Sequence, residues 1–180
     1  MTSANDIIQF WFHEISPGDR WKKSDAFDAL IRERFTEVHT AAAQGELFSW
    51  RTDAEGRLAE IIVLDQFSRN MFRDSAESFA SDPMALVLSQ EAIVQQSDAE
   101  MDDDQRAFLY MPLMHSESLV VHELALKMFS QLESEGYLGF EKKHLAIIER
   151  FGRYPHRNEI LGRSSTSEEV EFLKGPGSSF

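Results

Sequence analysis

The 180-residue sequence contains no cysteine, which excludes disulfides, thiolate metal sites and cysteine nucleophiles and is typical of a cytoplasmic protein. It also has no apolar run near the roughly 20 residues that a membrane helix needs. The first residues, "MTSANDIIQFWF", contain neither a basic leader nor a small-residue cleavage site. We therefore expect a cytoplasmic protein that has no export signal and does not cross a membrane.

Positive charge is scarce in this chain. Its 18 Lys and Arg residues are outnumbered by 31 Asp and Glu residues, and the net charge is −13. Such a surface repels nucleic-acid phosphates and anionic lipids, so neither nucleic acid nor a membrane is an expected partner. One arginine-rich stretch near the C-terminus departs from this pattern and is a candidate anion site.

Large apolar side chains are plentiful, with 14 Phe and three Trp among 42% apolar residues. A chain of this length can bury one sizeable core. Apolar residues recur at spacings of three and four almost throughout, and the alternation typical of strands is missing. The prediction is an all-α fold, a single-domain array of about seven to nine antiparallel helices over residues 1–174, followed by a flexible tail, "GPGSSF", at 175–180.

Capping and breaking residues predict where the helices begin and end. Ser24 is a candidate N-cap with Gly45 at the far end of its helix, and a further helix is expected at about 53–72. Asp82 before a proline predicts a cap and first turn, and Pro112 predicts a break. Further signals are Ser116 as an N-cap, Gly152 as a helix end, and capping boxes that join Ser165 to Glu168 and Thr166 to Glu169.

The stretch "LDQFSRNMFR", residues 64–73, places polar side chains directly after an apolar helical run. On a helix, Asp65 and Arg69 lie four residues apart. Gln66 and Asn70 have the same spacing, and so do Arg69 and Arg73, so these side chains form one patch. They either satisfy one another as a structural network or form a pocket wall that binds a polar or anionic ligand.

A second polar cluster lies in "MPLMHSESLVVH", where His115 and Glu117 follow a proline at the expected start of a helix. His115 either packs and caps, or acts as a general acid or base that Glu117 orients, because imidazole titrates near neutrality. Metal binding by His115, Glu117 and His122 is a third interpretation. Their spacing does not match HExxH, and residues two apart on a helix point apart, so no metal site is predicted.

The third cluster, "RFGRYPHRNEILGRSST", has Glu159 as its one acid. Gly152 and Pro155 predict an irregular turn that displays "HRN" on a loop, with Asn158 as a cap of "EILG". The arginines either pair with acids of other helices or clamp a carboxylate or phosphate, with His156 available for proton transfer. The basic residues of this cluster are Arg150, Arg153, His156, Arg157 and Arg163.

Three blocks of the sequence resemble the signatures of a bacterial family of uncharacterised proteins, domain of unknown function 924. The blocks are "LAEIIVLDQFSRNMFR", "FLYMPLMHSESL" and "GRYPHRNEILGRSSTSEEVEFL", and "FWF" and "FDALIRERF" are similar to its N-terminal part. The resemblance implies a tetratricopeptide-like right-handed superhelix and no established activity, substrate or cofactor. His122 stands where the family usually has Gln, which further weakens the metal interpretation. The signatures include Asp65, Gln66, Arg69, Asn70, His115, Ser116, Glu117, Arg153, Pro155, His156, Arg157, Asn158 and Arg163.

The three clusters together supply Arg, His, Asn and Glu, the residue types of acid–base sites, and we expect them to converge on one interior space. The main functional prediction is a polar pocket for a small anionic or polar ligand. One alternative is a small-molecule hydrolase or transferase that uses His115 or His156 as acid or base, oriented by Glu117 or Asp65. The other is a peptide-binding module, and a homodimer stays open. No cofactor is predicted, and Arg157→Ala is expected to abolish anion binding with little change in melting temperature.

Overall fold

The computed structural model describes residues 2–179, and these residues contain helices and turns but no strand. Met1 and Phe180, the ends of the predicted domain and tail, lie outside the described residues. None of the described helices has the length and apolar character that a membrane span requires. The α-helices are α1 (Ala4–Gln9), α2 (Asp25–Ala43), α3 (Ala54–Ile62), α4 (Ser68–Met71), α5 (Asp82–Val94), α6 (Asp103–Met114), α7 (Leu119–Phe129), α8 (Glu135–Phe151) and α9 (Ser167–Leu173).

Shorter helical pieces connect these elements. Two are π-helical and directly continue an α-helix, at Phe10–Glu14 after α1 and at Val63–Phe67 between α3 and α4. The others are 3-10 turns at Pro17–Trp21, Phe48–Thr52, Ala76–Phe79, Ser97–Glu100 and Pro155–Arg157.

The helix expected at about 53–72 runs as a continuous rod from α3 through the π segment Val63–Phe67 to α4. Asp53 caps it by accepting a hydrogen bond from the Gly56 amide at 2.7 Å. A Cβ on Gly56 would lie 1.9 Å from the Trp50 carbonyl oxygen, so only glycine fits there. The π segment widens the helix by one residue at the point where the apolar run gives way to polar residues.

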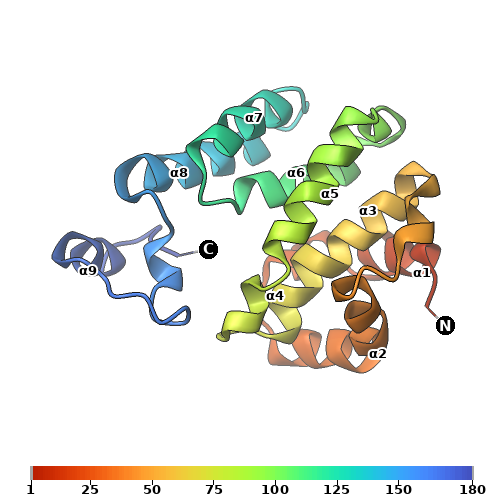
Figure 1. Ribbon diagram of the computed structural model, residues 1–180, viewed down its shortest axis with the longest axis horizontal. Helices are drawn as coiled ribbons and strands as arrows, with labels where there is room; N and C mark the ends of the chain where they lie inside the picture. Colours follow the sequence, from red (N-terminus) through yellow and green to blue (C-terminus); the bar gives the residue numbers. More distant parts are fainter. Residues whose placement is uncertain (1, 180) are drawn as a thin grey trace.

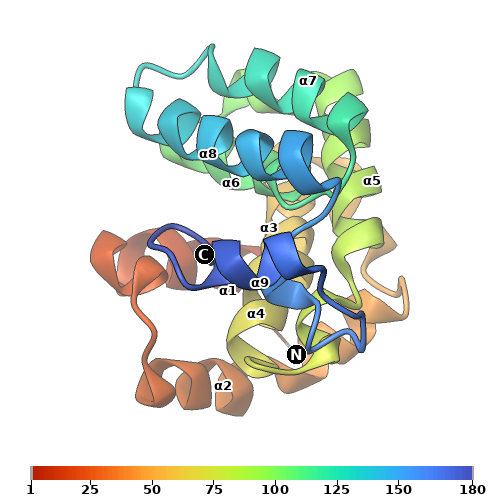
Figure 2. The same cartoon turned by 90° about the vertical axis from the view of Figure 1, so that its left-hand side faces the viewer.

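Consecutive helices pack on one another along the chain. The α3 rod contacts α1, α5 and α6, and α6 packs on α7, which packs on α8 (Figure 1). Seen from the side, α7 and α8 lie together above α2, while α9 and the turn before it lie between these levels (Figure 2). The C-terminal segment after α8 is thereby folded back toward the α3 rod.

The main core is aromatic in its centre. The Phe35 ring stacks on Phe67 and is tilted against Phe10, with centroids 4.8 Å apart in each pair, and Trp11 packs edge-on against Phe108. A separate small cluster consists of Ile147, Ile148 and Tyr154 with Phe151 and Phe172. The second cluster anchors the C-terminal segment to α8, independently of the main core.

Several predicted boundaries are confirmed. Ser24 accepts from the Phe27 amide at the start of α2, and α2 ends at Ala43, just before Gly45 with φ of 73°. Gly152 ends α8 with φ of 68°, and Thr166 with Glu169 forms the capping box of α9. The predicted tail starting at residue 175 stays a prediction.

Pro112 was expected to break the chain, and this is wrong, because it lies inside α6. A proline removes one hydrogen bond of the helix and displaces the carbonyls of the preceding turn. The buried hydroxyl of Ser89 on α5 donates to the Leu109 carbonyl at 2.6 Å, so a neighbouring helix supplies a hydrogen bond in that turn. The break comes after His115, whose amide still donates to Met111.

Two predicted caps are wrong as well. Ser81, not Asp82, occupies the N-cap position of α5, and the Asp82 carboxylate accepts from Arg69 and Arg157 and not from a helix amide. Ser116 does not cap α7, which begins at Leu119 after Ser118. The Ser116 hydroxyl instead accepts from the Ser118 amide and closes the turn between α6 and α7.

Candidate functional site

The three polar segments converge at one place, which we call the His115 cluster: Asp65, Arg69, Asp82, His115 and Arg157. His115 Nδ1 lies 2.7 Å from Asp65 Oδ1, although the two residues are 50 positions apart. Arg69 donates to both Asp82 oxygens, at 3.0 and 3.1 Å. Arg157 donates to Asp82 at 3.3 Å and to the His115 carbonyl at 3.1 Å. The predicted convergence of "LDQFSRNMFR", "MHSE" and "YPHRN" is therefore present.

The buried carboxylate of Asp65 fixes the proton on His115. The Asp65 side chain is 1% exposed. Burial opposes its ionisation, but the charge of Arg69 and the His115 contact outweigh burial and hold the pKa of Asp65 well below its usual range. Gln66 also donates to it, at 2.6 Å. An ionised Asp65 only accepts, so His115 Nδ1 carries the hydrogen in this bond.

This arrangement leaves the other imidazole nitrogen as the basic one. Burial, and next the charge of Arg69, lower the pKa of His115, so the neutral ring carries its one hydrogen on Nδ1. Nε2 then has a free lone pair, and among the hydrogen bonds of residues 2–179 none engages it. The His115 side chain is 15% exposed.

Arg157 is held more tightly than a displayed loop residue would be. Its guanidinium carbon lies 4.5 Å from the Phe79 ring centroid and 4.6 Å from that of Tyr154. The residue is only 7% exposed, and its buried Nε has no hydrogen-bond partner in the described chain. The expectation that "HRN" is displayed is wrong, because pairing with Asp82 lets the arginine enter the interior.

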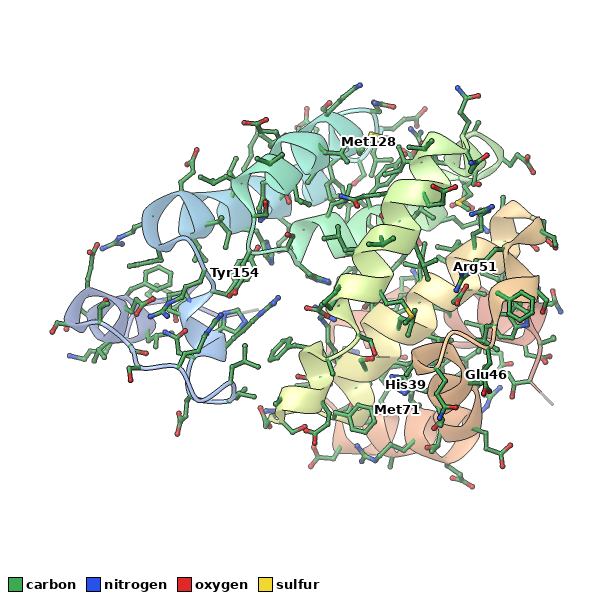
Figure 3. All side chains as sticks on the ribbon, in the orientation of Figure 1. His39, Glu46, Arg51, Met71, Met128 and Tyr154 are labelled. Atoms are coloured by element: carbon green, nitrogen blue, oxygen red, sulfur yellow. The ribbon has the colours of Figure 1, made fainter. Side chains whose placement is uncertain are left out.

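A buried layer behind His115 fixes the turn that carries it. Tyr154, labelled in Figure 3, donates from its hydroxyl to the Met114 carbonyl at 2.6 Å. His122 Nε2 donates to the Ser116 carbonyl at 2.8 Å, and its Nδ1 lies 2.6 Å from Glu141 Oε1. These contacts define the backbone on both sides of His115. They also occupy both nitrogens of His122, the third residue of the metal interpretation.

Glu117 does not orient His115, contrary to one of the two predicted options. Its carboxylate accepts from Arg163 at 2.6 and 2.9 Å and from the Tyr154 amide at 2.7 Å. These donors outweigh burial and lower the pKa of Glu117. Asn158 is fully buried and accepts from Arg163 at 3.0 Å, so it does not cap "EILG". Glu117, Asn158 and Arg163 together join the C-terminal segment to the α6–α7 turn.

Two residues of the opening motif turn away from the cluster. Asn70 and Arg73 both donate to the buried Asp28 of α2, Asn70 at 2.8 Å and Arg73 at 2.6 and 2.8 Å. The predicted single patch is thus divided, because Arg69 and Arg73 are drawn to different carboxylates. Asn70 and Arg73 fasten α4 to α2 and are not candidate ligands of the same site.

The remaining predicted residues of the third cluster lie at its edge. Arg153 pairs with Glu169 of α9 at 2.7 and 2.8 Å, and Arg150 pairs with Glu168. His156 packs beside Tyr154, with ring centroids 5.7 Å apart, and burial lowers its pKa to about 4. His115, the other candidate proton carrier, is held by the carboxylate of Asp65 at 2.7 Å.

The model of a family described as bacterial protein of unknown function (DUF924) matches residues 7–177. The chain belongs to this family. The resemblance inferred from the three blocks is therefore confirmed, and no curated protein gives a significant match.

A solved structure of a protein of unknown function from Agrobacterium tumefaciens is similar over nearly the whole chain. Its TM-score is 0.91 and its sequence is 40% identical, with 96% of this chain and 97% of that chain covered. The DUF924 chain described here shows, within residues 2–179, no group of three or more His, Asp or Glu residues placed to hold a metal ion. Sequence reasoning missed Asp82 as the carboxylate between the two arginines, and it missed the supporting side chains Phe79, Tyr154 and Glu141.

Proposed function

We propose that the His115 cluster binds a small molecule with an acidic group and that His115 accepts a proton from it or from a water beside it. The observation that carries this proposal is the Asp65–His115 hydrogen bond, with Nε2 as the basic nitrogen. An imidazole held by a buried carboxylate is the usual arrangement of a general base.

The acidic group of the ligand would take the position of Asp82. Arg69 offers a two-pronged guanidinium to this carboxylate, and Arg157 adds a third donor to Asp82 Oδ2. Carboxylates and phosphates match the same fork. Because the Asp82 side chain is partly exposed, it can swing outward while a ligand takes its place.

Hydrolysis or group transfer is the reaction class that we infer for the enzymatic version of this site. His115 would deprotonate a water or a hydroxyl, while Arg69 and Arg157 would hold the charged part of the substrate. The chain has no cysteine nucleophile. Burial lowers the pKa of both His115 and His156, so the choice of His115 rests on its hydrogen bond to Asp65.

Phosphate titration of Asp82→Asn tests the binding step. The variant removes the competing charge, so it should bind inorganic phosphate about tenfold more tightly than the wild type, which corresponds to ~1.4 kcal/mol. The titration is followed by NMR on the His115 ring nitrogens and the Arg69 Nε–H. Asp28→Asn is the matched control, because Asp28 is likewise bound by an arginine fork, outside the cluster.

Two results would overturn the proposal. One is a phosphate affinity that rises equally in Asp82→Asn and Asp28→Asn, which would reflect a general loss of negative charge. The other is a His115 ring that carries its hydrogen on Nε2, which long-range ¹H–¹⁵N spectra distinguish from Nδ1.

For the architecture, we infer the tetratricopeptide-like right-handed superhelix implied by the family resemblance. The packing of α6 on α7 and of α7 on α8 supports it, because stacked helix pairs contact their neighbours in the chain. The peptide-binding alternative requires exposed aromatic side chains in a groove. The exposed rings of Trp21 and Phe140 lie near the start of α6, at the opposite end of that helix from His115.

A further inference from the structure

A hollow of about 310 Å³ lies between the 3-10 turn Pro17–Trp21, the start of α6 and the first turns of α8. We call it the aromatic groove; its lining includes Trp21, Asp103, Asp104, Tyr137 and Phe140. The twelve residues of α6 separate it from His115 by about 17 Å. The groove is therefore independent of the site proposed above.

The aromatic side chains of the groove are unusually exposed for their size. Trp21 is 57% exposed and Phe140 is 53% exposed. Trp21 is nevertheless held in place, because its ring stacks on Phe108 with centroids 5.7 Å apart. One face of the indole is thus covered, and the exposed part faces the groove. A fixed, half-covered aromatic ring is a prepared contact surface.

The carboxylates of the groove, Asp103 and Asp104, are partly exposed. Asp104 accepts from Arg20 at 2.8 Å and from the Tyr137 hydroxyl at 2.7 Å. These donors outweigh burial and lower the pKa of Asp104. Asp103 accepts from Arg106 at 3.3 Å and from the Glu133 amide at 2.6 Å. Each carboxylate oxygen has a second lone pair, so both residues can accept one further hydrogen bond beside these partners. The protein itself places a cation on this surface, because Lys143 Nζ lies 5.2 Å above the Phe140 ring.

We propose that the aromatic groove is a docking site for an arginine side chain on an extended segment of a partner protein. A guanidinium is planar, stacks on Trp and Phe rings, and donates from its edge to carboxylates. It therefore matches both the aromatic and the acidic residues that line the groove. The volume of about 310 Å³ is at the lower limit of small-molecule pockets and fits one long side chain. The net charge of −13 favours approach of a basic segment.

The test is an NMR titration with two tripeptides, Ac-Gly-Arg-Gly-NH₂ and the same peptide with citrulline. Citrulline has nearly the shape of arginine but no charge. The arginine peptide should shift the indole N–H signal of Trp21, which Trp21→Phe identifies. The citrulline peptide should bind about tenfold more weakly, because the charge-assisted hydrogen bonds and the cation–π contact are lost.

Phe140→Ser supplies the decisive variant. It removes an exposed ring, and the affinity for the arginine peptide should fall about threefold. Phe48→Ser is the matched control, because Phe48 is 69% exposed and does not line the groove, and this variant should bind as the wild type does.

Three outcomes would overturn the proposal. They are equal binding of the two peptides, equal effects of Phe140→Ser and Phe48→Ser, and tighter binding of tetramethylammonium than of the arginine peptide at the same signals. The last would identify a site for small quaternary ammonium ions and not a protein-docking surface.

Discussion

Replacement of Arg157 by alanine should destabilise the protein. From its position in an apparent loop, the sequence predicted almost no change in melting temperature, and the structure reverses this expectation. The guanidinium is buried, and it donates to Asp82 and to the His115 carbonyl. It also lies between the rings of Phe79 and Tyr154.

The expected loss of unfolding free energy follows from the Arg157 contacts that the variant lacks and from the Asp82 contacts that it keeps. Two hydrogen bonds to or from charged groups contribute about 1.5 kcal/mol each, and the two ring contacts about 0.5 kcal/mol each. The variant also avoids the cost of burying a cation, and Asp82 keeps both bonds from Arg69. The net loss should be about 2–3 kcal/mol, which lowers the melting temperature by about 4–12 °C for a chain of this length.

Thermal and urea denaturation, monitored by circular dichroism, measure this loss. Arg150→Ala is the matched control, because Arg150 forms an ion pair with Glu168 in which both side chains are more than half exposed. Exposed pairs contribute less than about 1 kcal/mol, so the control should shift by less than about 4 °C. Equal melting temperatures of the two variants would refute the conclusion that Arg157 is a structural part of the interior.

Two further predictions concern stability. Lowering the pH from 7 to 5 should cost about 3 kcal/mol in urea denaturation, because burial lowers the folded pKa of His144 to about 3 and of His156 to about 4. The unfolded chain then takes up protons near pH 6.5 that the folded state does not, so stability present above that pH is lost below it; an unchanged stability at pH 5 would contradict this. Gly56→Ala should cost about 3 kcal/mol, because the new Cβ meets the Trp50 carbonyl, and a variant as stable as the wild type would contradict it.

Local sequence patterns predicted what depends on neighbours in the chain. The spacing of Asp65 and Arg69 placed both on one helical face, and they form an ion pair at 3.0 Å. The caps at Ser24 and Thr166 followed from the residue types that accept hydrogen bonds from free amides. Either Glu117 or Asp65 was predicted to orient His115, and Asp65 is the residue that contacts it.

The parts that sequence reasoning missed depend on partners far away in the chain. Asp28 and Asp82 both lie in the first turn of a helix, where an acid is already explained by the helix dipole. The neighbouring residues do not show that Asp28 binds Arg73, 45 positions later in the chain. They also do not show that Asp82 binds Arg157, 75 positions later. An acid in such a position carries no local sign that distinguishes a cap from a buried ion pair.

The charges of the His115 cluster limit what a ligand can gain there. Arg69 and Arg157 are balanced by Asp65 and Asp82, and His115 is neutral, so the cluster has no net charge. A simple anion that displaces Asp82 exchanges one carboxylate-like partner for another and must also be ordered on binding. Its affinity for the wild type should therefore be weak, on the order of millimolar. A ligand that binds more tightly has to make a contact that Asp82 cannot make. Within the cluster, His115 Nε2 can still accept a hydrogen bond, so we expect such a ligand to donate one to it.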